Sequence, residues 1–421
     1  MRTKSLGIIL VSLSLLSVPA HVRAEVMSLQ QVVAEVQTQN PQVRGALHRW
    51  ESATHQIIQN YTPADPQFTY LDNDSPNHWL GGGADLHNVT VTQSLQFPGK
   101  GLLQGQAAKR TAEIARLTYF AAVRDVKAQA ETGYYELQLD NALIDLFTEN
   151  VANLERVQKV TQIAYAASTV PQGDYINSQF ALEADRETLR QGRVTVANDK
   201  TALNILLARR PDEPLEVDRA FDLAPFETSL DEIVARAIAA RQEILEAALA
   251  QQNQSTALTL ARLEYAPDYS LGFGFDHYLV TSFAPAPSHT EDYSFTVGFN
   301  VPIFFWAKNE DIAKAHQNLE AAKEDLSSIR IQTAGQVTTL YRQILRSRET
   351  ALLYRDTLIP LARQAFEVMI IAFQNGKVDF TTLISAFRQE SDSRATYLRA
   401  VNQLLAGKVA LEQAAGGPLH Q

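Results

Sequence analysis

Apolar and small side chains recur every three or four residues through the C-terminal part of the chain, where the only proline between Pro302 and Pro418 is Pro360. This period predicts a hairpin of two long helices over about 308–412, with a turn near Gly376. An arm of about 60 residues is about 90 Å long, so we expect a rod that packs on other rods. The predicted seam of its first arm consists of Ile344, Ser347, Ala351, Tyr354, Leu358, Leu361, Ala365, Val368 and Ala372.

Alternation of apolar and polar residues marks four shorter segments and predicts β-strands there. Pro98 and Pro302 each follow the second strand of a pair, and polar loops rich in glycine or proline separate the two strands. A second long region of helix-forming residues predicts another helical hairpin over about 100–208. The four predicted strands are about 67–72, 88–97, 268–276 and 293–301.

The order helix, strand, strand, long hairpin occurs twice, which indicates an internal duplication. Pro98 and Pro302 are 204 residues apart, and the hairpin turns at Ser168 and Gly376 are 208 residues apart. The predicted fold class is mainly α with a small β part. The two structural repeats are expected at 25–228 and 229–421.

The first 24 residues have the features of a secretory signal peptide. Arg2 and Lys4 form a charged start, a largely apolar run follows over 6–18, and Val22 and Ala24 are the small residues that a signal peptidase reads. We predict cleavage after Ala24. An uncleaved membrane anchor is the alternative, although the apolar run is short for a helix that spans a bilayer.

Composition and charge exclude several classes of protein. The chain of 421 residues has no cysteine, so it has no disulfide, no thiolate nucleophile, no cysteine-based metal site and no lipidated N-terminal cysteine. Its formal net charge is −10 and no basic stripe is visible, which argues against nucleic acid as a partner. The Gly272-Phe273-Gly274 sequence lacks the following helix and acidic residue of a dinucleotide site, and no catalytic constellation appears. We therefore expect neither an enzyme nor a bound cofactor.

The predicted strands point to an assembly. Strands of about nine to ten residues, as at 88–97 and 293–301, suit a tilted crossing of a bilayer. Four strands cannot close a barrel, and open edges are not tolerated in lipid. Three copies would supply twelve antiparallel strands, which can close, and would also place the helical rods in a ring. We expect a homotrimer.

At two strand ends and in the long helix the sequence resembles the TolC family of outer-membrane efflux ducts. The resemblance lies in 93–100, with its Phe-Pro-Gly-Lys junction, in 298–304, and in Leu358-Ile359-Pro360. The Phe-Pro-Gly-Lys junction is similar to that of the branch serving heavy-metal efflux pumps. The resemblance implies a trimer with a 12-stranded transmembrane β-barrel in the outer membrane of a Gram-negative bacterium and a periplasmic α-helical barrel. It also implies a periplasmic adaptor (membrane fusion) protein and an inner-membrane transporter as partners.

The same resemblance places a gate and an adaptor contact at the periplasmic tip, where the two hairpins turn. In the first turn Ser168 replaces the family's usual glycine, and in the second turn the positions where acidic relatives carry carboxylates hold Thr382 and Ser385. The alternative is a purely structural role in helix capping, with Asp174 as an N-cap and Gly376 as a helix stop. The candidate tip residues are Ser168, Asp174, Gly376, Lys377, Asp379, Thr382 and Ser385.

Histidines and aromatic residues gather near the predicted strands. His78, His87, His277 and His289 flank the loops between strands, but their spacing does not form a recognisable ligand set, so we expect no metal site. Aromatic residues near the end of the last strand would form either an interfacial belt facing lipid headgroups or the packing at the joint between barrel and helices. They are Phe295, Phe299, Phe304, Phe305 and Trp306.

We therefore expect a passive exit duct of a tripartite efflux system that carries metal cations or small toxic compounds, while the pump supplies the energy. Two other functions remain open at the level of sequence. A type I protein secretion duct would use the same kind of tube. A periplasmic coiled-coil adaptor or structural protein would have no pore, although an adaptor should carry a lipoyl-like β-rich segment between its hairpin halves, and none is visible.

Overall fold

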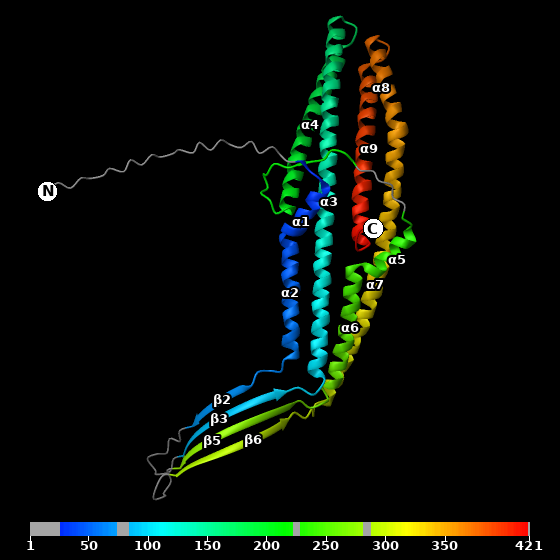
Figure 1. The fold of residues 1–421 in the computed structure, drawn as a ribbon. Helices are drawn as coiled ribbons and strands as arrows, with labels where there is room; N and C mark the ends of the chain where they lie inside the picture. The colour runs from blue at the N-terminus through cyan, green and yellow to red at the C-terminus, as the bar shows by residue number, and fades with distance from the viewer. Residues whose placement is uncertain (1–25, 74–83, 222–227, 281–287, 420–421) are drawn as a thin grey trace, which may run out of the picture.

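In a computed structural model the chain forms a long bundle of helices with a small sheet at one end and two helical turns at the other (Figure 1). The structure describes residues 26–73, 84–221, 228–280 and 288–419. The segment 1–24 lies outside these residues, so the signal peptide and its cleavage after Ala24 stay predictions. The predicted fold class, mainly α with a small β part, is confirmed.

The sheet contains two antiparallel hairpins, one from each half of the chain. Its strands are β2 (Gln67–Asn73), β3 (Ala84–Leu95), β5 (Tyr269–Val280) and β6 (Ser288–Phe299), in the order β2-β3-β5-β6. The two hairpins are joined by antiparallel pairing of β3 with β5. Consequently β2 and β6 are the two edges of the sheet in a single copy.

The strands are longer than the alternation suggested. β3 begins at Ala84 and not near 88, and β5 and β6 have 12 residues each. The residues added to β6 are polar and those added to β3 and β5 are of mixed character, yet the ladder continues through them, since Ala84 still pairs with Val280. Backbone pairing extends these strands beyond the point where apolar side chains alternate.

Four long helices run beside one another in each half of the bundle. α3 (Lys100–Ala166) is continuous over 67 residues, which corresponds to about 100 Å. Near the sheet the order is α2 (Pro41–Tyr61), α3, α6 (Gln242–Leu263) and α7 (Phe305–Leu353). Toward the turns the order is α4 (Gln172–Leu206), α3, α9 (Phe380–Ala414) and α8 (Ile359–Gln374).

Shorter elements lie midway between the sheet and the helical turns, a level that we call the waist of the bundle (Figure 1). α1 (Leu29–Gln39) packs on α3, and α5 (Leu230–Ala240) packs on α7. The strands β1 (Val26–Met27) and β4 (Glu216–Val217) form a short parallel pair. Pro41 is the first residue of α2, a position where its missing amide costs no helical hydrogen bond, and Asn40 caps that helix.

The predicted seam of the last hairpin is only partly correct. Ile344 and Ala351 are buried as expected, but Leu361 and Val368 are 56% and 53% exposed, and Ala362 and other neighbouring positions are buried in their place. A π-helical turn at Tyr354–Leu358 separates the two regions, with the amide of Ile359 bonded to the carbonyl of Tyr354. Because this turn contains one extra residue, every position after it rotates relative to α9.

Pro360 gives the physical reason for the turn. A proline within a helix has no amide to donate and its ring crowds the carbonyl four residues earlier, so the preceding turn widens. A constant period of three and four residues could not reveal this shift.

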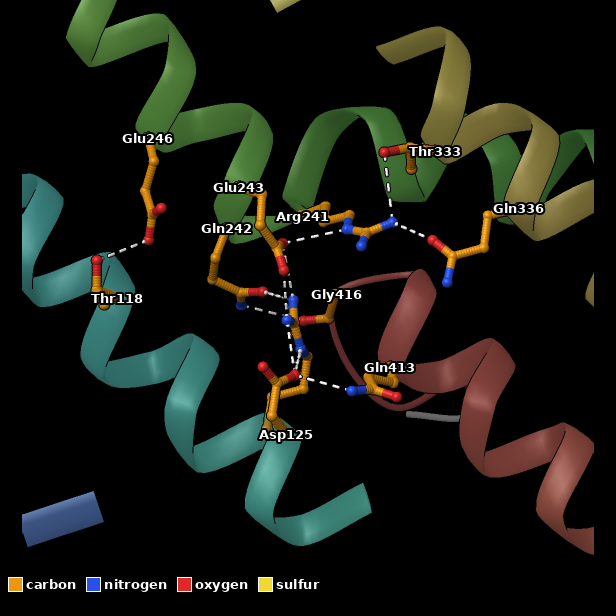
Figure 2. A network of polar contacts seen from close by, with 11 residues as sticks. Thr118, Asp125, Arg241, Gln242, Glu243, Glu246, Thr333, Gln336, Gln413 and Gly416 are labelled. Atoms are coloured by element: carbon orange, nitrogen blue, oxygen red, sulfur yellow. Dashed lines mark hydrogen bonds and ion pairs between the residues drawn. The ribbon is translucent and has the colours of Figure 1, made fainter. Parts of the chain in front are cut away.

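A polar network at the waist ties together four of the helices (Figure 2). Arg124 of α3 donates to Glu243 Oε1 at 2.6 Å and to Gln242 Oε1 at 2.6 Å, both in the first turn of α6. Gln413 of α9 donates to Asp125 Oδ1 at 3.0 Å. Figure 2 shows these side chains converging between the ribbons, so the network fixes the first half of the chain against the second.

The network continues to α7 through Arg241, which immediately precedes α6. Its guanidinium donates to Gln336 Oε1 at 2.9 Å and to Thr333 Oγ1 at 3.3 Å. Burial acts to raise the pKa of Glu243, but hydrogen bonds and charge from Arg124 and Arg241 outweigh it and lower that pKa to about 2. The carboxylate is thus strongly favoured in the folded state.

We predict that Arg124→Met destabilises the protein by about 3 kcal/mol, because Glu243 then loses its main partner in a half-buried site. The matched control is Arg363→Met, whose exposed ion pair with Glu367 should contribute about 0.5 kcal/mol or less. Thermal or chemical unfolding of the purified protein measures both. Equal effects of the two substitutions would contradict the importance of the network.

The pH dependence of stability gives a second test of the ion pair between Arg124 and Glu243. The pKa of Glu243 in the folded state lies below its ordinary value of 4.5. Its contribution to stability is therefore present above about pH 4.5 and is lost as pH falls toward 2. The free energy of unfolding of the Arg124→Met variant should therefore fall much less over the same pH range.

Candidate functional site

The sheet has two faces of opposite character, which the strand register defines. One face carries a row of apolar side chains in which Val91, Phe273 and Phe295 are cross-strand neighbours. Phe295 is 71% exposed in a single copy, and Phe299 on the same face is similarly open. Exposed apolar surface of this extent marks a surface that contacts lipid or protein.

The opposite face is lined by hydroxyl side chains and glycine. Thr92, Gly272 and Thr296 are neighbours in one row, and the next rows continue the pattern. A Cβ atom added at Gly274 would lie 2.5 Å from Ser294 Oγ, so the glycine leaves room for its neighbour. In β3, β5 and β6 these rows present only short side chains, while β2 adds Gln67, Thr69 and Leu71 to the same face. The short members are Thr90, Thr92, Ser94, Ser270, Gly272, Gly274, Ser294, Thr296 and Gly298.

The Phe-Pro-Gly-Lys junction links the sheet to α3. Gly99 has φ of 101°, which turns the chain sharply into the helix. Lys100 is only 2% exposed, and its ammonium lies 2.9 Å from Asp268 Oδ1 and 3.2 Å from Glu264 Oε1. Burial acts to lower the pKa of Lys100, but hydrogen bonds to Asp268 and Glu264 leave it raised. The junction thus positions the strands relative to the helices through a buried charged lysine.

The two turns at the far end have the same backbone geometry. Ser168 and Gly376 both adopt the left-handed conformation, with φ of 58° and 65°. In each turn the amide of this residue bonds to the carbonyl three residues earlier at 2.9 Å, and the next amide bonds five residues back at 2.9 Å. This is the Schellman arrangement that ends a helix. The left-handed conformation that it requires is about 1 kcal/mol less favourable in free energy for serine than for glycine.

The capping interpretation is correct for Gly376, which ends α8, and wrong for Asp174, while a cap that the sequence analysis did not name lies at Asp379. Asp379 caps α9, where its carboxylate accepts from the Thr382 amide at 2.9 Å. Hydrogen bonds from Thr382 lower the pKa of Asp379. Asp174 is instead the third residue of α4, whose N-cap position is Pro171 without any side-chain cap. A negative charge in the first turn interacts favourably with the positive end of the helix dipole, but it does not cap the first amides.

The two turns are held at one level by an apolar cluster between the hairpins. Phe373 and Phe380 of the second turn pack in the same cluster as Leu154 and Leu182 of the first hairpin. The structure thus brings the predicted tip residues to one end of the molecule. Of the remaining candidates, Lys377 is exposed, and Ser385 donates to the carbonyl of Thr381 at 2.7 Å.

Sequence reasoning missed the aromatic residues of the first tip. Tyr165 and Tyr175 stack across the turn with ring centroids 5.6 Å apart. Phe180 is 71% exposed one turn further along α4. These residues lie at helical spacing and carry no recognisable motif, so the sequence offered no signal for them.

A pair of carboxyl groups at the α3–α4 contact was also missed. Asp140 lies against Asp199, beside a cavity of about 310 Å³ that is lined in part by Glu136 and Asp199. Burial, the hydrogen bond to Asp199 and the negative charges of Asp199 and Glu136 raise the pKa of Asp140 to about 7, and Arg399 partly offsets them. Only the pairing of two helices distant in sequence brings these carboxyls together.

The histidines do not converge on one point. His87 and His277 are neighbours on β3 and β5 with ring centroids 6.3 Å apart, and His87 Nδ1 lies 3.2 Å from Asp72. His289 lies in β6, and nothing is described of its side chain, while His78 lies outside the described residues. Within the described segments, no group of three or more His, Asp or Glu side chains has the geometry to hold a metal ion. Nor is any described helix both long and apolar enough to cross a membrane.

Comparison with known proteins agrees with this geometry. Residues 233–417 match the family model described as outer membrane efflux protein. The cobalt-zinc-cadmium resistance protein CzcC of Cupriavidus metallidurans is 19% identical over 392 residues, which cover 93% of this chain and 90% of that protein.

Solved structures share the fold over almost the whole chain. The outer membrane protein VceC of Vibrio cholerae has a TM-score of 0.78 at 14% identity, with coverage of 93% of this chain and 97% of that chain. The open state of the MtrE outer membrane channel of Neisseria gonorrhoeae has a TM-score of 0.76 at 15% identity, covering 93% and 89%.

The fold is therefore that of an outer-membrane efflux channel, with strands at one end and helical hairpins at the other. The match of residues 233–417 to the outer membrane efflux protein family adds sequence similarity to this shared fold. Channels of this family in tripartite systems are trimers that work with adaptor proteins and inner-membrane pumps, and family and fold are not those of enzymes. The efflux channel is favoured over the pore-free adaptor and the secretion duct.

We predict that Asp140→Asn stabilises the protein at pH 8 by about 1 kcal/mol and has little effect at pH 4. The pKa of Asp140 is raised in the folded state, so the contribution of its protonated form is present in acid and is lost as pH rises through about 7. Asparagine stays neutral beside Asp199 at both pH values without needing a proton. Thermal unfolding at the two pH values measures the difference.

The control is Asp145→Asn on the same helix, where the carboxylate pairs with Arg219 at an exposed site. It should show no gain at pH 8. A destabilising effect of Asp140→Asn at pH 8 would indicate that the ionised carboxylate is favoured there, contrary to the prediction.

Proposed function

We propose that three copies of the chain form one continuous duct that passively conducts metal cations or small toxic compounds from a periplasmic adaptor to the exterior. The observation that carries this proposal is the two-faced, open-edged sheet. Its edges β2 and β6 belong to opposite sides of one copy, so β6 of one copy can pair with β2 of the next. Twelve strands then close with the short hydroxyl and glycine side chains inside.

The same assembly accounts for the apolar face. With Phe273 and Phe295 turned outward, the barrel contacts outer-membrane lipid, and the hydroxyl face keeps the lumen wet. Phe304, Phe305 and Trp306 are all more than half exposed near the end of β6, which supports an interfacial aromatic belt over packing at the joint. The mature chain in this proposal consists of the repeats 25–228 and 229–421, after cleavage of the signal peptide following Ala24.

The class of substrate is proposed from the relative and from the lumen. CzcC is named for resistance to cobalt, zinc and cadmium. The rows of hydroxyl and glycine residues offer little apolar surface, so they suit hydrated cations and small polar solutes. In a strain lacking the gene, the chain should restore growth on cobalt, zinc or cadmium. Restored export of a protein without restored metal resistance would favour the secretion duct.

Because the chain has no cysteine, single thiols can test the barrel directly. In membranes, Thr296→Cys should react with a membrane-impermeant maleimide, since its side chain faces the wet lumen. The adjacent Phe295→Cys should react at least ten times more slowly, because it faces lipid. Equal labelling of the two neighbours would rule out the proposed barrel wall.

We further propose that the tip turns gate the duct and contact the adaptor. Ser168, Gly376 and Lys377 lie in the turns, and Asp174 and Asp379 add negative charge at the same end. Three copies would bring these charges together around one axis, where repulsion or pairing with a basic partner would set the opening.

Two pairs of substitutions separate the effect of charge at the tip from the effect of helix capping. Asp174→Asn together with Asp379→Asn removes two charges per copy but keeps a good N-cap at position 379. Conductance in planar bilayers should change severalfold. If only the corresponding alanine pair changes conductance, these residues act as structural caps and the charge gate is wrong.

A further inference from the structure

One row across the sheet consists entirely of imidazole and carboxylate side chains. The register makes Asp72 of β2, His87 of β3, His277 of β5 and Glu291 of β6 successive cross-strand neighbours, so all four project from one face. The row lies two residues beyond Phe275 on the apolar face, toward the end of the sheet that points away from the helices (Figure 1). The apolar face therefore ends in a row of groups that can bind a cation.

The two histidines lie face to face in the middle of this row. The ring planes of His87 and His277 are inclined by 19° and their centroids are 6.3 Å apart. Two imidazoles that share one tetrahedral zinc ion have centroids about 5 Å apart, because each ligating nitrogen lies about 2 Å from the ion. Partly exposed side chains can close the remaining distance of about 1 Å by rotation about their side-chain bonds. The spacing therefore allows both imidazoles to bind the same ion.

The neighbouring side chains orient His87 for this role. Asp72 Oδ1 lies 3.2 Å from His87 Nδ1, and the hydroxyl of Tyr70 lies 3.3 Å from the same nitrogen. An Nδ1–H group that donates to Asp72 leaves the lone pair of Nε2 as a metal ligand, and carboxylates hold metal-binding histidines in this way. Glu291 stands across from His277 in the register, so two carboxylates flank the two neutral imidazoles and their charge attracts a cation.

We propose that His87 and His277 bind one divalent transition metal ion, such as Zn²⁺ or Cu²⁺, and that Asp72 is a positioning residue for His87. Imidazole nitrogen suits these ions, whereas Mg²⁺ and Ca²⁺ prefer oxygen ligands. Among the residues that the structure describes, no third side chain completes the ligand set, so water fills the remaining positions. The two histidines are 190 residues apart in the chain, which is why spacing in the sequence forms no ligand motif.

A bound ion would connect the two halves of the chain. His87 belongs to the β2–β3 hairpin and His277 to the β5–β6 hairpin, and within the sheet these hairpins are joined by the pairing of β3 with β5. An ion that binds this pairing and not the unfolded chain stabilises it. The site is formed within one copy, on the face opposite the hydroxyl rows, so it goes beyond the proposed duct and does not depend on it.

Zinc titration of the purified protein tests the site. The chain is purified in detergent without a polyhistidine tag, stripped with a chelator and titrated with Zn²⁺ in a calorimeter. The double variant His87→Asn with His277→Asn should bind Zn²⁺ at least about ten times more weakly, because both ligands are removed. Saturating Zn²⁺ should raise the unfolding temperature of the parent protein by about 2 °C and leave that of the double variant unchanged.

The matched control is His48→Asn with His55→Asn, which removes two exposed imidazoles from α2. These residues lie about 10 Å apart along the helix and cannot share an ion, so the affinity for Zn²⁺ should not change. Asp72→Ala tests the positioning residue. It should weaken Zn²⁺ binding about tenfold while the unfolding temperature of the metal-free protein stays the same, which separates orientation of His87 from a role in stability.

Pulsed electron paramagnetic resonance of bound Cu²⁺ counts the coordinated imidazoles directly. We expect two in the parent protein and one in His277→Asn. The proposal is wrong if the parent shows fewer than two, if the double variant binds Zn²⁺ as tightly as the parent, or if the control pair loses as much affinity as the test pair. These measurements use detergent-solubilised protein and no transport, so failure of the metal-resistance assay would overturn the duct without affecting the site.

Discussion

The side chains that stabilise the long helices lie along narrow stripes, because a rod one helix wide cannot build a thick core. Near the tip, Leu154 and Phe387 meet between the hairpins, while Phe180 on the far side of α4 has no cover within the copy. The sheet repeats this imbalance, with Phe295 open on one face and β2 and β6 unpaired at their outer edges. Burial confined to stripes therefore leaves apolar side chains and two strand edges open in the single chain.

The waist has a different role from the two ends. There Arg124 and Arg241 connect α3, α6 and α7, and Gln413 of α9 donates to Asp125 of α3, through hydrogen bonds that involve charged groups. Such bonds are directional and are strengthened by partial burial, so they fix the helices relative to one another more firmly than apolar stripes alone. The tip relies on apolar packing between the hairpins and on exposed turns. The chain therefore holds its waist through directional polar contacts and its tip through apolar packing between the hairpins.

The sequence predicted the repeated order of elements because helical and strand periods are local properties. The strands near Val91 and Phe295 and the turn at Gly376 were all evident from spacing and from glycine or proline. The burial of Leu361 and Val368 was predicted wrongly, because a single π-helical turn changes the phase of a seam without changing its composition. The role of Asp174 as a cap was also wrong, since one residue of register decides between a cap and a first-turn acid.

Other features depend on contacts that no local pattern contains. Asp140 and Asp199 are adjacent only because α3 and α4 fold back on one another. Arg124 reaches Glu243 across more than a hundred residues of chain. The tip residues were chosen through a family resemblance, and the structure places them at one end without assigning them a gate.

The glycine and hydroxyl face of the sheet has a consequence for how such a protein changes over evolutionary time. Side chains as short as those of Ser270, Gly272 and Thr296 cannot reach across a wide lumen to grip a passing solute. A wall of this kind does not distinguish one small polar solute from another, so inherited changes in which of them the cell expels need not alter it. Selection for new cargo would then act on the energised partner and on the far turns, and the barrel could be reused unchanged.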